Sequence, residues 1–138
     1  MGCTKIALAV IFIALVDQIT LYLQSVAAQP FYTSKDYFFI WGSTWLPWNQ
    51  TAESFILPLA FSLAKGLIFT FAYLSFKLRK GKFSALRFLS ILILLSVALP
   101  FFLVFIMFSI PPAFIFLLSI QQAATCAAAV FILRQVIE

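Results

Sequence analysis

The chain is built from long apolar stretches separated by short polar ones. Four apolar stretches of about 20 residues each fill most of its length, and a helix of that length crosses a hydrocarbon core about 30 Å thick. The pattern therefore predicts an all-α membrane protein with four transmembrane helices in a single domain, 1–138, and one long loop at 27–54. The predicted spans are 6–26, 55–76, 88–108 and 113–133.

The composition agrees with this pattern. Hydrophobic residues make up 64% of the chain and charged residues 9%, whereas soluble domains average about 45–50% and about 25%. The excess of apolar surface predicts that the lipid bilayer is the first partner of the chain. The sequence contains no histidine, and Cys3 and Cys126 lie far apart without the spacing of metal ligands. We therefore expect no metal, no other cofactor and no His-dependent catalysis.

The basic residues give the expected orientation. Lys5 precedes the first span, Arg134 follows the last, and the 27–54 loop contains only Lys35. Because cytoplasmic loops are enriched in Lys and Arg, both termini should be cytoplasmic and the long loop outside, with the bacterial inner membrane as the favoured location. The net charge of +5 then reflects topology, and no nucleic-acid partner is expected. The predicted cytoplasmic basic loop contains Lys77, Arg79, Lys80, Lys82 and Arg87.

The first apolar stretch has an alternative interpretation. Lys5, the apolar run and the small residues at 26–28 also fit a cleavable signal peptide. The stretch is long for that role and contains Asp17, so we favour a retained first span.

Two charged residues lie inside apolar stretches, Asp17 in the first and Lys65 in the second. A charge at the bilayer centre costs about 2.5–3.5 kcal/mol, and the helical rise places these two about 16 and about 18 Å from the cytoplasmic ends of their spans. The sequence predicts a buried polar layer made of Asp17, Gln18, Lys65, Gln121 and Gln122. Such a layer could be an ion pair that fixes helix register, a proton or ion relay, or the polar floor of a substrate cavity. A relay usually contains more than one carboxylate, and Asp17 is the only acid within a predicted span.

The 27–54 loop is rich in aromatic residues and contains all three tryptophans of the chain. Amphipathic aromatic side chains favour the headgroup region, so we expect the loop to lie on the membrane surface. The alternative is a platform that holds a lipid, a lipidated chain or a partner helix. The residues of this outer-loop platform are Tyr37, Phe39, Trp41, Trp45 and Trp48.

One short segment resembles a known family. Val-Asp-Gln-Ile-Thr at 16–20 resembles the opening motif of the lipoprotein (type II) signal peptidases, and Asn49, Ala52 and Phe55 resemble residues that follow it in that family. The resemblance implies four membrane helices, cytoplasmic termini and an extended outer cradle.

The same comparison shows departures from the family. Leu21 stands where the family has a lysine, and the asparagine and aspartate-arginine motif of its third span has no counterpart in the uncharged segment 96–108. Its final catalytic aspartate is also missing, since Ile120 or Gln121 occupies that region. Because the family uses two aspartates around one water, as base and acid, the sequence predicts no catalytic residues and no enzymatic activity of this kind.

These observations leave three functional hypotheses. The first is a non-catalytic small subunit or scaffold that packs with other membrane protein subunits, since the third span is rich in Phe and Leu and has no chemistry of its own. The second is a small proton-coupled transporter, because a single acid in a first helix resembles the small four-helix multidrug exporters. The third is a lipoprotein-binding or lipid-binding protein related to the type II signal peptidases.

Overall fold

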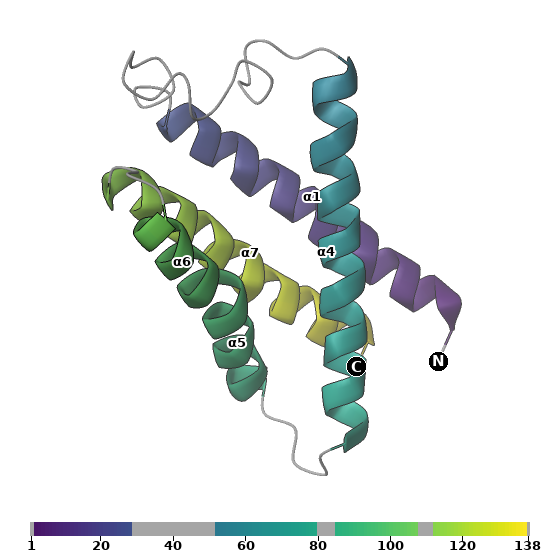
Figure 1. Cartoon of the computed structure of the whole chain (residues 1–138). Coiled ribbons are helices and arrows are strands. Elements are labelled where there is room, and N and C mark those ends of the chain that lie inside the picture. The colour runs from purple at the N-terminus through teal and green to yellow at the C-terminus, as the bar shows by residue number, and fades with distance from the viewer. Residues whose placement is uncertain (1, 29–51, 80–84, 108–111, 138) are drawn as a thin grey trace.

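The computed structural model describes residues 2–28, 52–79, 85–107 and 112–137, which form an all-helical chain (Figure 1). The prediction of four helices that are long and apolar enough to cross a membrane is confirmed. Three of them are continuous, and the third is divided into three consecutive segments. The elements are α1 Cys3–Ala27, α4 Ala52–Arg79, α5 Ala85–Ile93, the π-helical segment η3 Leu94–Ala98, α6 Leu99–Met107 and α7 Pro112–Ile137.

α1, α4 and α7 extend past the predicted spans by a few residues, because polar residues near the ends of these apolar stretches continue the helix. The third helix begins three residues before its predicted span of 88–108 and is described as far as Met107. The residues of the predicted outer-loop platform, Tyr37, Phe39, Trp41, Trp45 and Trp48, lie outside the described part of the chain. Lys80 and Lys82 of the predicted basic loop also lie outside it.

The four helices pack around α1 and α7. α1 makes its main contacts with α7 on one side and with α4 on the other, while α5, η3 and α6 contact α7. Figure 1 shows α4 crossing α1 at a steep angle, with α5–η3–α6 alongside α7. The start of α1 and the end of α7 lie at one end of the bundle, together with the end of α4 and the start of α5; we call this the termini end.

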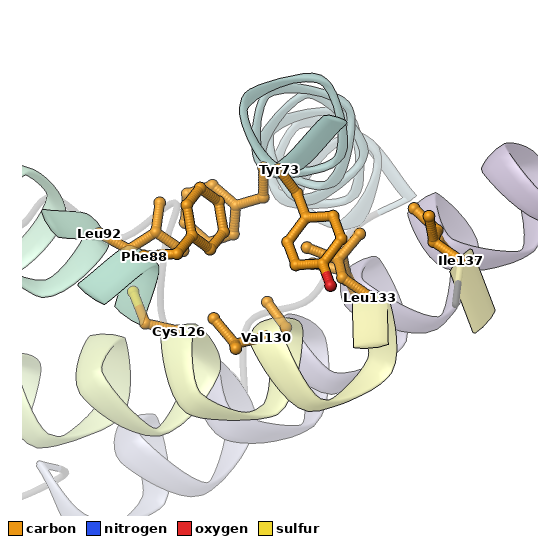
Figure 2. Close-up of a cluster of buried hydrophobic side chains, with 11 residues drawn as sticks. Tyr73, Phe88, Leu92, Cys126, Val130, Leu133 and Ile137 are labelled. Atoms are coloured by element: carbon orange, nitrogen blue, oxygen red, sulfur yellow. The ribbon is translucent and has the colours of Figure 1, made fainter. Parts of the chain in front are cut away.

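A cluster of apolar side chains fills the termini half of the bundle (Figure 2). Phe88 of α5 is almost fully buried and meets the ring of Tyr73 edge-on, with the centroids 5.4 Å apart. The ring centroid of Phe76 lies 5.5 Å from that of Phe88, so two aromatic contacts join α4 to α5 at this end. We call the set the apolar cluster; it contains Ala9, Ile13, Phe69, Tyr73, Phe88, Leu92, Cys126, Ala129, Val130, Leu133 and Ile137.

Gly66 sets the distance between α4 and α1. A Cβ at this position would lie 2.8 Å from the backbone oxygen of Val10, closer than side-chain carbons approach in proteins. Small residues allow helix backbones in membranes to come this near. The crossing at Gly66 also places its neighbour Lys65 within reach of α1.

The π-helical segment η3 precedes Pro100. The N–H of Leu99 bonds the carbonyl of Leu94, five residues back, and Pro100 has no N–H with which to continue an α-helical pattern. Ser96, inside this segment, donates its hydroxyl to the carbonyl of Leu92, and the thiol of Cys126 on α7 lies 3.8 Å from the same hydroxyl. The wider turn thus accommodates the proline, while Ser96 satisfies a backbone carbonyl and contacts α7.

Candidate functional site: a polar layer between α1, α4 and α7

The site is centred on an ion pair between α1 and α4. Lys65 lies at the middle of α4, and its Nζ donates to Asp17 Oδ1 at 2.6 Å. The hydroxyl of Ser62, one turn earlier on α4, donates to Asp17 Oδ2, also at 2.6 Å. Asp17 is only 4% exposed. Both of its carboxylate oxygens therefore accept their hydrogen bonds in the interior of the bundle.

The network extends from this pair to two glutamines. Lys65 Nζ also donates to Gln122 Oε1 of α7 at 3.2 Å. On α1, Gln18 Nε2 donates to the Ser62 hydroxyl at 2.7 Å. Asp17, Gln18, Ser62, Lys65 and Gln122 therefore form one connected network that joins α1, α4 and α7.

Gln121 belongs to a second, smaller cluster. Its Nε2 donates to Thr20 Oγ1 at 3.1 Å and to Thr125 Oγ1 at 3.3 Å, and the two hydroxyl oxygens are 2.9 Å apart. Thr20 in turn donates to the backbone oxygen of Asp17 at 3.0 Å. Adjacent helical residues point about 100° apart, so Gln121 and Gln122 serve different interfaces.

Sequence reasoning missed three members of these clusters. Ser62 lies three residues before Lys65, Thr20 three after Asp17, and Thr125 four after Gln121. Residues three or four apart share a helix face, so a search for hydroxyls one turn from each intramembrane charge or amide would have found them.

Several polar groups near the layer have no partner among the described residues. Gln121 Oε1 and Gln24 Nε2 are buried without a hydrogen bond. Lys65 uses two of its three N–H groups, and its side chain is 24% exposed. The layer is therefore closed around Asp17 and partly open beside Lys65.

The chemistry of this arrangement is that of a neutral ion pair. The Lys65 ammonium balances the Asp17 carboxylate, and each carboxylate oxygen accepts one hydrogen bond from α4. Within residues 2–28, 52–79, 85–107 and 112–137, no three His, Cys, Asp or Glu side chains are grouped as metal ligands would be. The described residues can hold three helices in register.

The basic residues of the predicted cytoplasmic loop that the structure describes lie at the termini end. Lys77 near the end of α4 and Arg87 near the start of α5 are both exposed, and Arg79 is the last residue of α4. These residues lie near the two ends of the α4–α5 connection, so they place positive charge at the termini end of the bundle.

The chain was also compared with known proteins. No family model, no curated protein and no solved structure matches it.

Proposed function

We propose that this chain is a non-catalytic subunit or scaffold of a larger membrane complex. In this proposal it spans the bacterial inner membrane with both termini cytoplasmic, and other membrane protein subunits are its partners. The observation that carries the proposal is that both carboxylate oxygens of Asp17 accept hydrogen bonds from α4, one from Lys65 and one from Ser62. The only acid in the predicted spans is thus engaged in holding helices together.

Energetics favour a structural role for this pair. An ion pair in a low-dielectric interior gains little over apolar residues of the same size, because removing both charges from water costs about as much as their attraction provides. What such a pair supplies is specificity, since either charge alone would be strongly unfavourable in the bilayer. A defined rotation and register of α1, α4 and α7 is what a subunit needs to present a constant surface.

The third helix offers such a surface. Leu94, Leu95, Leu99 and Phe102 are exposed, and none of the residues of α5, η3 and α6 is acidic. An apolar helix face of this kind packs against another helix through van der Waals contact.

Native mass determination after gentle extraction tests the proposal. A discrete assembly with the same stoichiometry in two mild detergents is the expected result. A monomer that carries only lipid in both detergents would overturn it.

The orientation is tested separately with the native thiols. Cys3 is exposed at the start of α1 and Cys126 is buried, so a membrane-impermeant maleimide should label Cys3 in inverted vesicles and leave it unlabelled in intact spheroplasts. Cys126 is the internal control and should stay unlabelled in both. Labelling of Cys3 in spheroplasts would contradict cytoplasmic termini.

A proton-coupled transporter is the second candidate, and one observation favours it. Lys65 is partly exposed on the surface of the bundle although Asp17 beside it is buried. Proteoliposomes containing the chain should then take up ethidium in response to a pH gradient, and Asp17→Asn should abolish this uptake. Uptake that survives Asp17→Asn would rule this candidate out.

A further inference from the structure

The polar layer is open beside Lys65. Its ammonium has three N–H groups; two donate to Asp17 Oδ1 and Gln122 Oε1, and the third has no partner among the described residues. The side chain is 24% exposed, while that of Asp17 is 5% exposed. The accessible part of the ion pair is therefore its donor side.

The neighbouring amide also presents donors. Gln122 accepts from Lys65 through Oε1, its Nε2 makes no hydrogen bond with the described residues, and the side chain is half-buried. Both oxygens of Asp17 are already occupied. Lys65 and Gln122 thus each hold an N–H donor without a partner among the described residues, and an acceptor that met both would satisfy them.

Charge and depth restrict what that acceptor is. Asp17 already neutralises Lys65, so a second carboxylate would leave an uncompensated negative charge at mid-bilayer, which is costly. Lys65 lies at the middle of α4, where lipid contributes only hydrocarbon. An uncharged acceptor at this depth is most simply the side chain of another transmembrane helix.

The surface around Lys65 suits a helix. Phe61 and Ile68 lie one turn before and one turn after it on the same edge of α4, and they are 62% and 65% exposed. Residues at i−4, i and i+3 form one continuous stripe. Gly66, which carries the close contact with α1, points about 100° away from Lys65, and contacts between α4 and α7 are sparse. Phe61 and Ile68 therefore remain uncovered by the described residues.

We propose that the stripe Phe61–Lys65–Ile68 binds a transmembrane helix of a partner subunit, and that this helix places an uncharged acceptor, the side-chain oxygen of Asn, Gln, Ser or Thr, against Lys65 and Gln122. The inference rests on the proposed subunit function and adds the chemistry of the partner. Interhelical hydrogen bonds of this type are known to direct helix association in membranes.

Synthetic transmembrane helices provide a defined probe. The chain, labelled at exposed Cys3 with an acceptor dye, is reconstituted in vesicles with donor-labelled Leu/Ala helices of about 22 residues that carry Asn, Asp or Leu at the centre. Energy transfer should show the Asn helix binding about tenfold more tightly than the Leu helix, and moving the Asn two turns toward one end should remove the preference. Equal binding of the Asn and Leu helices, or tighter binding of the Asp helix at neutral pH, would overturn the proposal.

Variants of the chain provide the second arm. Asp17→Leu combined with Lys65→Met removes both charges and leaves the net charge unchanged, so this variant should fold. It should have a clearly weaker preference for Asn, because only the Gln122 amide remains as a donor. Phe61→Ala should weaken all three helices equally, because it removes packing and leaves the donors. An unchanged Asn preference in the charge-free variant would overturn the proposal; if that variant does not fold, the comparison of helices on the native chain decides.

Failure of this inference is distinguishable from failure of the proposed function. A fixed assembly in native mass determination together with no Asn preference would leave the subunit function standing and remove the assigned partner chemistry. A monomeric chain that still prefers the Asn helix would remove the subunit function and support the acceptor-binding edge.

Discussion

Replacing Asp17 alone should destabilise the bundle more than replacing Asp17 and Lys65 together. Asp17→Leu leaves the Lys65 ammonium without its counter-charge at the middle of α4, 24% exposed. A lone charge at the bilayer centre costs about 2.5–3.5 kcal/mol, and partial exposure places the expected loss at about 2 kcal/mol. Lys65→Met should cost a similar amount, because it leaves the Asp17 carboxylate buried with only the Ser62 hydroxyl as a donor.

The double substitution should cost about 1 kcal/mol or less. At the observed N–O distance of 2.6 Å and an effective dielectric constant of about 20, the attraction is about 6 kcal/mol. Desolvation of the two charges offsets most of it, so removing both together changes the free energy of unfolding little. The two single effects should therefore fail to add by about 3 kcal/mol.

The measurement is reversible unfolding in mixed micelles with SDS as denaturant, applied to the two single variants and the double variant. Ser90→Ala is the matched control, since that exposed hydroxyl bonds only the carbonyl of Leu86 in its own helix and should add to Asp17→Leu without coupling. Asp17→Asn should fall between the native chain and Asp17→Leu, because it keeps an oxygen for Lys65 and loses the charge. A double variant as unstable as the sum of the single variants would refute the reasoning.

Three further outcomes are expected. Gly66→Ala places a methyl group 2.8 Å from a backbone oxygen of α1 and should lower the free energy of SDS unfolding by about 1–3 kcal/mol. Gly2→Ala is the control and should leave that free energy unchanged, because a Cβ there meets nothing within 4 Å. Equal effects of the two substitutions would contradict the close crossing of α1 and α4. Phe88 of the apolar cluster is 1% exposed, so Phe88→Ala should lower the free energy of unfolding by about 3–5 kcal/mol. Phe116 is 66% exposed, so Phe116→Ala should change it by less than about 0.5 kcal/mol. Similar losses in both variants would show that the cluster is not a core. The thiol of Cys126 is fully buried, so maleimide should modify it only after unfolding in SDS; modification in the folded chain at the rate of the exposed cysteine would contradict the packing of α7.

Element length and type were predictable because they depend on local pattern. A run of about 20 apolar residues leaves the backbone no partner in lipid except itself, so each run is a helix wherever it packs. The ranges 6–26, 55–76 and 113–133 accordingly fall within α1, α4 and α7. The interruption of the third helix at η3 was only partly predictable. Pro100 marks a disturbance in the sequence, whereas the π-helical form and the contact of Ser96 in η3 with Cys126 of α7 appear only in the structure.

The sequence by itself determined that Asp17 and Lys65 lie at similar depths, because depth follows from residue count and helical rise. Only the tertiary structure decided that they meet, since rotation about each helix axis is set by packing between helices, which includes the close contact of Gly66 with Val10. The same packing points Gln122 toward Lys65 and Gln121 toward Thr20. The sequence shows two adjacent glutamines and does not show that they face different partners. Local pattern fixes where a side chain lies along a helix, and contact between helices fixes which neighbour it faces.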